Sequence, residues 1–267
     1  MSYANAWLKW FDVIEGGAAP LTERMLALSE LESGHQVLDI GTGLGEPALS
    51  AATRLNKAGH VLAIDRDPNM IALAQQRAEA RGASNIDFRV ADVEALDLAP
   101  NSLDVVFARW SLMFVSDFAG VLSMLCEALR PGGKLVAVTW ASADLVPALS
   151  LARTTVQQHF KMPPSPQGQP KAFALEDAHT TKRALVQAGY QNVSVEPFSI
   201  AYEFPSPASY IQYRLDVAGP LWDNVGIAAE NAAREASAVI EMAMQPYRVA
   251  DDLYRFVNEA HCAVGNV

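Results

Sequence analysis

The 267-residue sequence has little cysteine, no excess of basic charge and no long apolar run, and each shortage argues against a class of protein. Its two cysteines, Cys126 and Cys262, lie far apart without the spacing of metal ligands, so we expect no metal site. Cys126 falls on an apolar helix face, which predicts a buried structural thiol and a reducing, cytoplasmic location. No segment approaches the roughly 20 apolar residues of a membrane-spanning helix, and a secretory signal pattern is missing from the first residues. We therefore expect no membrane insertion.

Basic residues are also sparse and scattered. The chain has 20 Lys and Arg residues against 30 Asp and Glu, for a formal net charge of −10 at pH 7. Nucleic-acid-binding proteins need basic patches that neutralise phosphates, so we expect no nucleic-acid partner. Hydrophobic residues make up 51% of the chain, which is enough for a substantial core. The length fits one large α/β domain with an added cap, or at most two small domains.

The most informative stretch that is present is VLDIGTGLG at residues 37–45. A buried apolar strand passes through Asp39 into a turn with glycines at 41, 43 and 45, where the backbone can take positive φ and approach a ligand closely. A phosphate-binding turn normally reads G-x-G-x-x-G, whereas the spacing here is G-x-G-x-G. A carboxylate two residues before the first glycine suits a cationic ligand better than a pyrophosphate. The alternative is that these glycines serve only to pack a strand-to-helix turn.

Acidic residues recur after the next strands, which favours a ligand site. Asp65 ends the apolar run at 60–64, and an acidic residue there is the usual anchor for a ribose diol. Asp92 and Val93 follow the strand at 86–90, where a carboxylate could accept from an exocyclic amine and a small apolar residue could cover a purine. Two further strands are expected at 103–107 and 134–140. Open α/β sheets bind ligands at the carboxyl ends of successive parallel strands, so the series predicts a nucleoside site.

Five segments together resemble the class I S-adenosylmethionine-dependent methyltransferases, and within them the branch of the ubiquinone/menaquinone-biosynthesis methyltransferases. They are VLDIGTGLG (37–45), AIDRDPNMIALAQQRA (63–78), FRVADVEAL (88–96), SLDVVFARWSLMFVSD (102–117) and ALRPGGKLVAVTW (128–140). These segments cover about the first half of the chain in the order and spacing of the family. The resemblance implies an α/β, Rossmann-like, doubly wound and mostly parallel seven-stranded sheet, with a helical cap from inserts after strands five and six.

The resemblance also implies how S-adenosylmethionine would be held. Asp39, Gly41 and Gly43 would line its methionine end, and Asp65, with Arg66 beside it, would hold the ribose hydroxyls. Asp92 and Val93 would hold the adenine, and Arg109 would lie beside the sulfonium. Two features depart from the family pattern. Glu46-Pro47 follows the third glycine, and Trp110 stands where the family tolerates several residues, so its role is open.

Two rival functions stay open at this point. An NAD-dependent dehydrogenase would want the third glycine one position later, would not need Asp39, and would need a hydride-transfer acid in a separate substrate domain. A protein that binds S-adenosylmethionine without methylating anything would carry the same motifs.

The sequence also argues against a DNA substrate. After the fourth strand it reads Ala-Arg-Trp-Ser (108–111) instead of the Asn-Pro-Pro-Tyr type of motif with which DNA amino-methyltransferases hold a flipped base.

The sequence predicts four consecutive segments. They are an N-terminal helical lid (1–33), the cofactor-binding core (34–141), a helical substrate cap with strand six (142–252) and a final antiparallel edge strand (253–267). Within the lid, Gly16-Gly17 is expected to break the first helix and act as a hinge. The other expected elements are helices at 46–57, 117–129, 145–160 and 175–188, strand six at 193–204 and a helical insert over about 206–250.

The expected acceptor is a small molecule, apolar or aromatic, such as a quinone-like compound or a natural product. Candidate contacts are Trp7, His159, Tyr210, Tyr213 and Trp222. The alternative is that these side chains only pack the cap. No catalytic base is identified, because methyl transfer needs one only if the acceptor must lose a proton. We expect a monomer or a homodimer.

Overall fold

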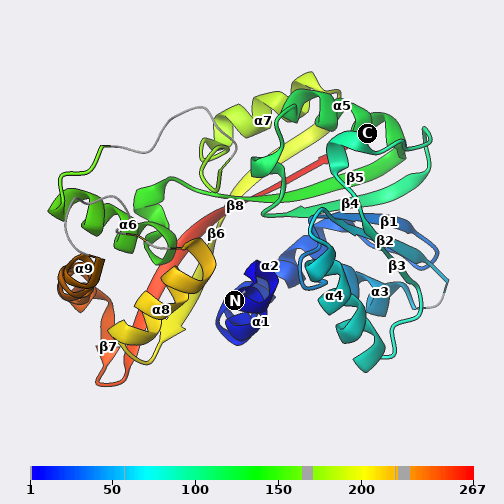
Figure 1. Ribbon diagram of the computed structural model, residues 1–267. Coiled ribbons are helices and arrows are strands. Elements are labelled where there is room, and N and C mark those ends of the chain that lie inside the picture. Colours follow the sequence, from blue (N-terminus) through cyan, green and yellow to red (C-terminus); the bar gives the residue numbers. More distant parts are fainter. Residues whose placement is uncertain (1, 57, 164–170, 220, 222–228) are drawn as a thin grey trace. The chain divides into compact units, whose positions relative to one another are not determined.

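The computed structural model describes residues 2–56, 58–163, 171–219, 221 and 229–267 (Figure 1). Trp222 and much of the proline-rich loop after residue 162 lie outside the described residues. The chain divides into two compact units, which we call the sheet unit (20–141, 169–198 and 260–267) and the helical unit (1–19, 142–168 and 199–259). This grouping differs from the four consecutive segments expected from the sequence, because residues 1–19 group with two later segments and residues 20–33 with the sheet.

A mainly parallel sheet is confirmed. Its strands are β1 (Gln36–Ile40), β2 (His60–Asp65), β3 (Ile86–Val90), β4 (Leu103–Arg109), β5 (Leu129–Trp140), β6 (Gln191–Phe204), β7 (Arg248–Ala250) and β8 (Leu253–Asn266). The order is β3-β2-β1-β4-β5-β8-β6, with β7 paired to β8. Strands β1 to β5 pair in parallel, so their carboxyl ends share one edge. Among the residues that the structure describes, the sheet has eight strands and not seven, because a three-residue strand, β7, lies in the stretch expected to be helical.

The expectation that the last strand forms the edge of the sheet is wrong. β8 pairs antiparallel with β5, from Lys134 opposite Asn266 to Trp140 opposite Ala260, and β6 takes the outer position beyond it. The segment 260–263 is buried throughout, which suits a strand with neighbours on both sides better than an edge strand.

Helices cover both faces of the sheet in the sheet unit. Helix α3 (Ala48–Leu55) packs on β2 and α4 (Pro68–Ala80) packs on β2 and β3, while α5 (Phe118–Ala128) packs on β5 and on α7 (Ala178–Gln187) (Figure 1). Side chains of β1 alternate between the two layers: Leu38 and Ile40 join the core cluster that includes α5, whereas Asp39 on the opposite face contacts the start of α3. The sheet is therefore doubly wound, and its carboxyl edge is left for loops.

The helix break expected at Gly16-Gly17 does not occur. Helix α1 (Tyr3–Lys9) ends at Trp10, and α2 (Phe11–Ser29) then runs without a break through Gly16-Gly17 and Pro20. Gly17 is required by packing, since a Cβ there would lie 2.4 Å from the carbonyl oxygen of Ala201 and 2.7 Å from the ring of Tyr202. The glycine pair thus permits a close helix–strand contact within the helical unit and does not interrupt the helix.

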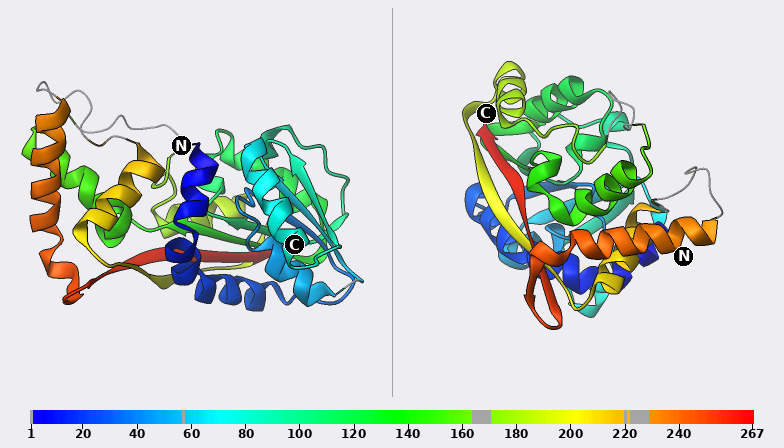
Figure 2. Two further views of the ribbon diagram at one scale, coloured as in Figure 1. Left: turned by 60° about the horizontal axis from the view of Figure 1, so that its bottom comes forward. Right: turned by 90° about the vertical axis from the view of Figure 1, so that its left-hand side faces the viewer.

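The helical unit is built from α1, α6 (Pro147–His159), α8 (Pro207–Ala218) and α9 (Ala229–Ala243), together with parts of β6 and β8. Helix α6 contacts α8 and α9, and α1 contacts α8 (Figure 2). Asp216 on α8 accepts from Lys9 Nζ at 2.6 Å and from the indole N–H of Trp10 at 2.8 Å, which fixes the end of α1 on α8. Short 3₁₀ turns occur at Val93–Ala95, Leu112–Phe114, Ala143–Leu145 and Gln245–Tyr247.

Candidate cofactor site in the sheet unit

The glycine turn after β1 takes the conformation that its composition allows. Gly41 and Gly43 have φ of 68° and 54°, in the left-handed region that favours glycine. A Cβ on Gly41 would lie 2.5 Å from Cβ of Ser111, so this glycine admits the loop after β4. A Cβ on Gly43 would meet nothing within 4 Å. The backbone of Gly43 therefore faces open space, so a ligand could approach it closely.

Asp65 at the end of β2 holds this turn in place. Its Oδ2 accepts from the backbone N–H of Gly43 at 3.0 Å, and its Oδ1 accepts from the N–H of Asp67 at 2.9 Å. Burial is the largest influence on this carboxyl and raises its pKa, against the lowering effect of the two N–H groups and of the exposed Arg66. Each carboxylate oxygen keeps a second lone pair, so Asp65 can still accept from two hydroxyl groups.

Asp39 is fully buried, and its burial dominates its electrostatics. Its Oδ2 accepts from the N–H of Ala48 at 3.3 Å, at the start of α3. Burial raises the pKa of Asp39 to about 7, although the Thr42 hydroxyl, the Arg109 guanidinium and the Ala48 N–H all act to lower it. A carboxyl in this state gains strongly from a nearby cation, because the cation offsets the cost of ionising it in a buried site.

The predicted adenine residues follow β3 as expected, but their side chains differ in character. Asp92 is exposed and caps the turn at Val93–Ala95 through the N–H of Glu94 at 3.0 Å. Val93 is only 7% exposed and packs in the core cluster with Leu38 and Leu122. Asp92 can therefore reach a ligand with its side chain, whereas Val93 retains little side-chain surface for one.

Arg109 at the end of β4 is anchored by a residue that the sequence argument did not single out. Its Nη1 donates to the hydroxyl of Thr22 on α2 at 3.0 Å, and its guanidinium lies 5.2 Å from the ring centroid of Trp110. Thr22 lies 87 positions away in the chain, and no local motif signals the pairing.

Two tryptophans at the same edge were also not paired by the sequence argument. Trp110 follows β4 and Trp140 ends β5, and their rings are stacked with centroids 4.6 Å apart and planes 14° apart. Trp110 has φ of 55°, which is uncommon for an aromatic residue. Strands β4 and β5 are parallel neighbours, and Arg109 aligns with Val138, so the two strands end at nearly the same level. That alignment is the signal that could have indicated contact between Trp110 and Trp140.

The four candidate acceptor contacts that the structure describes lie in the helical unit. Trp7 is partly buried with its ring 5.9 Å from that of Tyr3, and its indole N–H has no acceptor among the described residues. His159 is exposed, and its Nε2 lies 3.5 Å from Glu235 Oε2. For both, an acceptor contact stays a prediction.

Tyr210 and Tyr213 are core residues of the helical unit. Tyr210 is 0% exposed, stacks on Phe256 at 4.7 Å, and its hydroxyl accepts from the N–H of Ala152 at 3.2 Å. Tyr213 is 3% exposed and packs edge-on to Trp10 at 5.5 Å. Their burial favours the packing alternative over acceptor contact, because neither ring has surface to offer in this structure.

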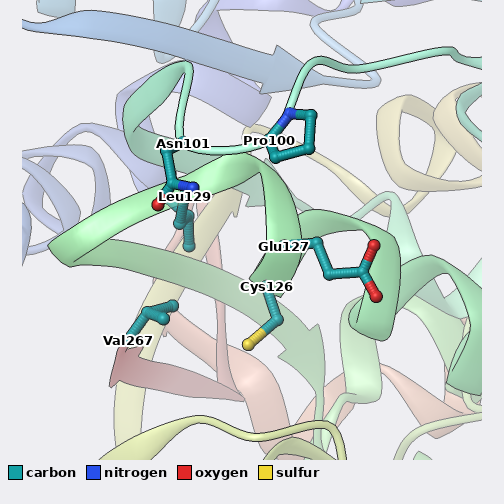
Figure 3. A pocket seen from close by; sticks show the side chains of 6 residues that line it. All are labelled: Pro100, Asn101, Cys126, Glu127, Leu129 and Val267. Atoms are coloured by element: carbon teal, nitrogen blue, oxygen red, sulfur yellow. The ribbon is translucent and has the colours of Figure 1, made fainter.

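A shallow hollow elsewhere does not coincide with this site. It is lined by Pro100, Asn101, Cys126, Glu127, Leu129 and Val267, which lie near the amino ends of β4 and β5 (Figure 3). Cys126 in this hollow is partly buried, not fully buried as expected, and burial raises the pKa of its thiol. A thiol with a raised pKa holds its proton at neutral pH and is a weak nucleophile.

Comparison with known proteins identifies the family. A model described as "Methyltransferase domain" matches residues 31–190, more than half of the chain. The chain belongs to the class I S-adenosylmethionine-dependent methyltransferases. The match includes β1 to β5 and every predicted cofactor residue from Asp39 to Arg109, so this methyltransferase domain and the site described above are the same part of the chain.

Relatives of this methyltransferase domain carry the names of several acceptors. The aklanonic acid methyltransferase of a Streptomyces species (strain C5) is 35% identical over 116 residues, which is 43% of this chain and 53% of that protein. The ubiquinone/menaquinone biosynthesis C-methyltransferase of Pseudomonas putida is 33% identical over 127 residues, which is 47% of this chain and 50% of that protein. The chain thus spans about half the length of these curated relatives.

Among solved structures, the cyclase SpnF has a TM-score of 0.56 and 21% identity, with 93% of this chain and 80% of that chain covered. At this identity the likeness is one of fold. In the part of the chain that the structure describes, no helix is long and apolar enough to cross a membrane.

Proposed function

We propose that this chain transfers the methyl group of S-adenosylmethionine to a small, apolar or aromatic acceptor. The observation that carries the proposal is the bare backbone of Gly43, open to space and fixed by Asp65 at the carboxyl edge of a methyltransferase-type sheet. A side chain at this position would occupy that space.

The residues present fit S-adenosylmethionine in their chemistry. Its methionine end is cationic, and Asp39 supplies a buried carboxyl whose pKa near 7 lets a cation favour its ionised form. Asp65 keeps lone pairs for a ribose diol, and Asp92 has an exposed carboxylate for the exocyclic amine of adenine. Arg109, anchored by Thr22, would border the sulfonium. The assignment of each residue to its part of the cofactor is a proposal.

When bound, the cofactor supplies a methyl group that its own sulfonium charge has already activated. Transfer would form a bond between an electron pair of the acceptor and the methyl carbon and would break the sulfur–carbon bond, whose electron pair would stay on sulfur. The protein's part is to hold the acceptor in line and exclude water, which can contribute about 7–11 kcal/mol. No general base is assigned, because methyl transfer needs one only if the acceptor must lose a proton.

Two rival functions are tested by the same preparation. A dehydrogenase would bind NADH, but the G-x-G-x-G turn and Asp39 favour a cationic nucleoside over a pyrophosphate. A non-methylating protein is the second rival, since one protein of this fold carries the name of a cyclase. Fold alone therefore does not decide that methyl transfer occurs.

The test is a transfer assay with S-adenosylmethionine labelled in its methyl group, against a panel of phenols, dihydroxynaphthalenes, carboxylic acids and amines. We expect labelled product from at least one class with the wild-type chain and with Asp87→Ala, and loss of product with Asp65→Ala. Asp87 is a suitable control because its side chain is 75% exposed on β3. Tight cofactor binding without product from any class would favour the non-methylating rival, and an enhanced NADH fluorescence on mixing would favour the dehydrogenase.

A small-molecule acceptor and a cytoplasmic location are part of this proposal. Both cysteines are free thiols, which agrees with a reducing compartment.

A further inference from the structure

We propose that Glu46 and Arg77 are positioning residues for S-adenosylmethionine, which hold the glycine turn in place from outside and do not touch the cofactor. This inference rests on the proposed function and deepens it, because it concerns the same site. It also assigns a role to Glu46, the acid after the third glycine that departs from the family pattern.

The first observation is that Glu46 is a buried acid with both of its oxygens engaged. The residue is 8% exposed. Its Oε2 accepts from the hydroxyl of Ser50 at 2.7 Å and from the backbone N–H of Ser50 at 3.3 Å, in the first turn of α3. Its Oε1 accepts from Nη1 of Arg81 on α4 at 2.7 Å. Glu46 therefore joins the start of α3 to α4.

The second observation is that Arg77 extends this link to the glycine turn. Arg77 lies four residues before Arg81 on α4, so the two side chains share one face of the helix. The Arg77 side chain is 17% exposed, and its Nη2 lies 3.8 Å from Glu46 Oε1. Its Nη1 donates to the backbone carbonyl of Leu44 in the turn.

The turn lies against this face of α4. A Cβ added to Gly45 would lie 3.5 Å from Cβ of Ala74, which is three residues before Arg77. Residues at this spacing share a helix face, so the turn and the Arg77 side chain meet on the same side of α4.

Two consecutive residues of the turn are therefore held by side chains from different elements. Asp65, at the end of β2, accepts from the N–H of Gly43, and Arg77 on α4 donates to the carbonyl of Leu44. A turn that is ordered before the ligand arrives costs no binding energy to order. The residues that support a binding group from behind can therefore change affinity without contact to the ligand.

The charge of Glu46 has a second effect on the site. Burial is the main cause of the raised pKa of Asp39, and the negative charge of Glu46 raises that pKa further. The Thr42 hydroxyl, the Arg109 guanidinium and the Ala48 N–H act in the opposite direction. Removing the charge of Glu46 should therefore let Asp39 ionise at a lower pH.

The test is calorimetric titration of S-adenosylmethionine into the full chain across a range of pH. Arg77→Met keeps an unbranched side chain and removes the donors, and we expect affinity to fall about tenfold because the turn must then be ordered on binding. Arg77→Lys keeps one charged donor and should lose less affinity than Arg77→Met. Melting temperatures show whether each variant is folded.

Glu46→Gln gives a readout that a merely structural role would not move. It keeps the shape of the side chain and one acceptor oxygen but removes the charge. The affinity of the wild type is expected to rise with pH as Asp39 ionises, so this rise should occur at a lower pH in Glu46→Gln, by about half a pH unit.

The matched controls come from a similar cluster at the amino ends of the strands. Asp104 at the start of β4 has a side chain that is 16% exposed. It accepts from the backbone N–H of Gln36 at 2.7 Å and from Nη1 of Arg130 at 2.5 Å. Arg130→Met and Asp104→Asn should lower the melting temperature, yet leave cofactor affinity within twofold of the wild type and its pH dependence unchanged.

The outcomes separate the two proposals. Failure of the wild type to bind S-adenosylmethionine overturns the proposed function and this inference with it. Wild-type binding combined with an affinity within twofold in folded Arg77→Met overturns this inference alone, as does an equal loss of affinity in Arg130→Met. A Glu46→Gln pH profile that coincides with that of the wild type also overturns it, and this comparison decides the matter if Arg77→Met does not fold.

Discussion

At the residue scale, Asp65 combines two tasks that a substitution can separate from folding. It fixes the glycine turn through Gly43 and keeps lone pairs for a ligand. We predict that Asp65→Ala weakens S-adenosylmethionine binding by about 1.5–3 kcal/mol, because hydrogen bonds involving a charged group are worth that much. The measurement is isothermal titration calorimetry, with far-UV circular dichroism to verify the fold.

The control for that prediction is Asp87→Ala, which removes the same charge from the neighbouring strand. Asp87 is largely exposed and pairs with His60 at 3.2 Å, so its loss should change affinity less than twofold. Equal affinities for the Asp65 variant, the Asp87 variant and the wild type would remove Asp65 from the site.

The raised pKa of Asp39 predicts a pH-dependent affinity. With a pKa of about 7, part of the Asp39 population holds a proton near neutral pH, and a bound cation must favour the ionised form. S-adenosylmethionine should therefore bind more tightly as the pH rises from about 6 to about 7.5, with proton release on binding. Calorimetry in buffers of different ionisation enthalpy measures the released proton.

The raised pKa of Asp39 also predicts how the stability of the chain changes with pH. Asp39 has a raised pKa in the folded chain, so the folded form keeps a proton that the unfolded chain releases between about pH 4 and pH 7. Stability without ligand should therefore fall across that window and level off above it. Asp39→Asn should lose both the pH-dependent affinity and this contribution to the stability profile, and a variant that keeps them would assign the effect to another group.

Much of the candidate cofactor site could be located from the sequence, because its residues follow successive parallel strands. The turn at residues 41–45 and the acids Asp39, Asp65 and Asp92 all lie at the expected strand ends. The contacts of Trp110 with Trp140 and of Arg109 with Thr22 could not be placed, since they join residues far apart in the chain. Nor does any residue type signal the positive φ of Trp110.

At the element scale, helix α2 illustrates why glycine alone does not define a break. Gly16 and Gly17 both lie inside the helix, yet only Gly17 faces another element. The sequence shows two glycines together and indicates a hinge, whereas the structure requires one of them for close approach to Ala201 and Tyr202. Tertiary packing, which no local pattern encodes, decided the outcome.

The two glycines make a matched pair of substitutions. Gly17→Ala should destabilise the chain by about 1–3 kcal/mol, because the new methyl group would overpack against the strand. Gly16→Ala, with nothing within 4 Å of the added Cβ, should stabilise it by about 0.5–1 kcal/mol through helix propensity. Thermal and urea unfolding measure both. Destabilisation by both changes to the same degree would indicate that the pair is a hinge after all.

The sheet also shows that local sequence patterns do not determine where a strand lies. Strand β8 was expected from its composition, but its place between β5 and β6 depends on non-local pairing, including pairing with β5 more than 100 residues earlier in the chain. The short strand β7 was not expected, because three residues carry too little periodicity to be recognised.

At the scale of the whole molecule, the helical unit has its own aromatic core. Tyr210 lies in it with Phe204 and Phe256, and its hydroxyl is satisfied by the backbone of α6. We predict that Tyr210→Ala lowers stability by about 3–5 kcal/mol, as truncation of a buried ring does. Activity should then fall only with the folded fraction.

The control in the same unit is Met242→Ala, since Met242 on α9 is 74% exposed and should tolerate truncation. Melting temperature and acceptor kinetics on the same preparations decide the matter. A Tyr210→Ala protein that melts like the wild type but has a raised acceptor KM would restore the acceptor role expected from the sequence.

The central proposal is that S-adenosylmethionine binds in the open space at Gly43, and one calorimetric titration tests it most directly. The comparison is Gly43→Ala against Gly82→Ala, because both glycines have positive φ, 54° and 66°, and neither has an atom within 4 Å of an added Cβ. The backbone cost is therefore similar, while Gly82 lies beyond the end of α4, away from the site. We predict one binding site with normal affinity in the wild type and in Gly82→Ala, and binding weakened at least tenfold in folded Gly43→Ala. Equal affinity in the two variants would contradict the account.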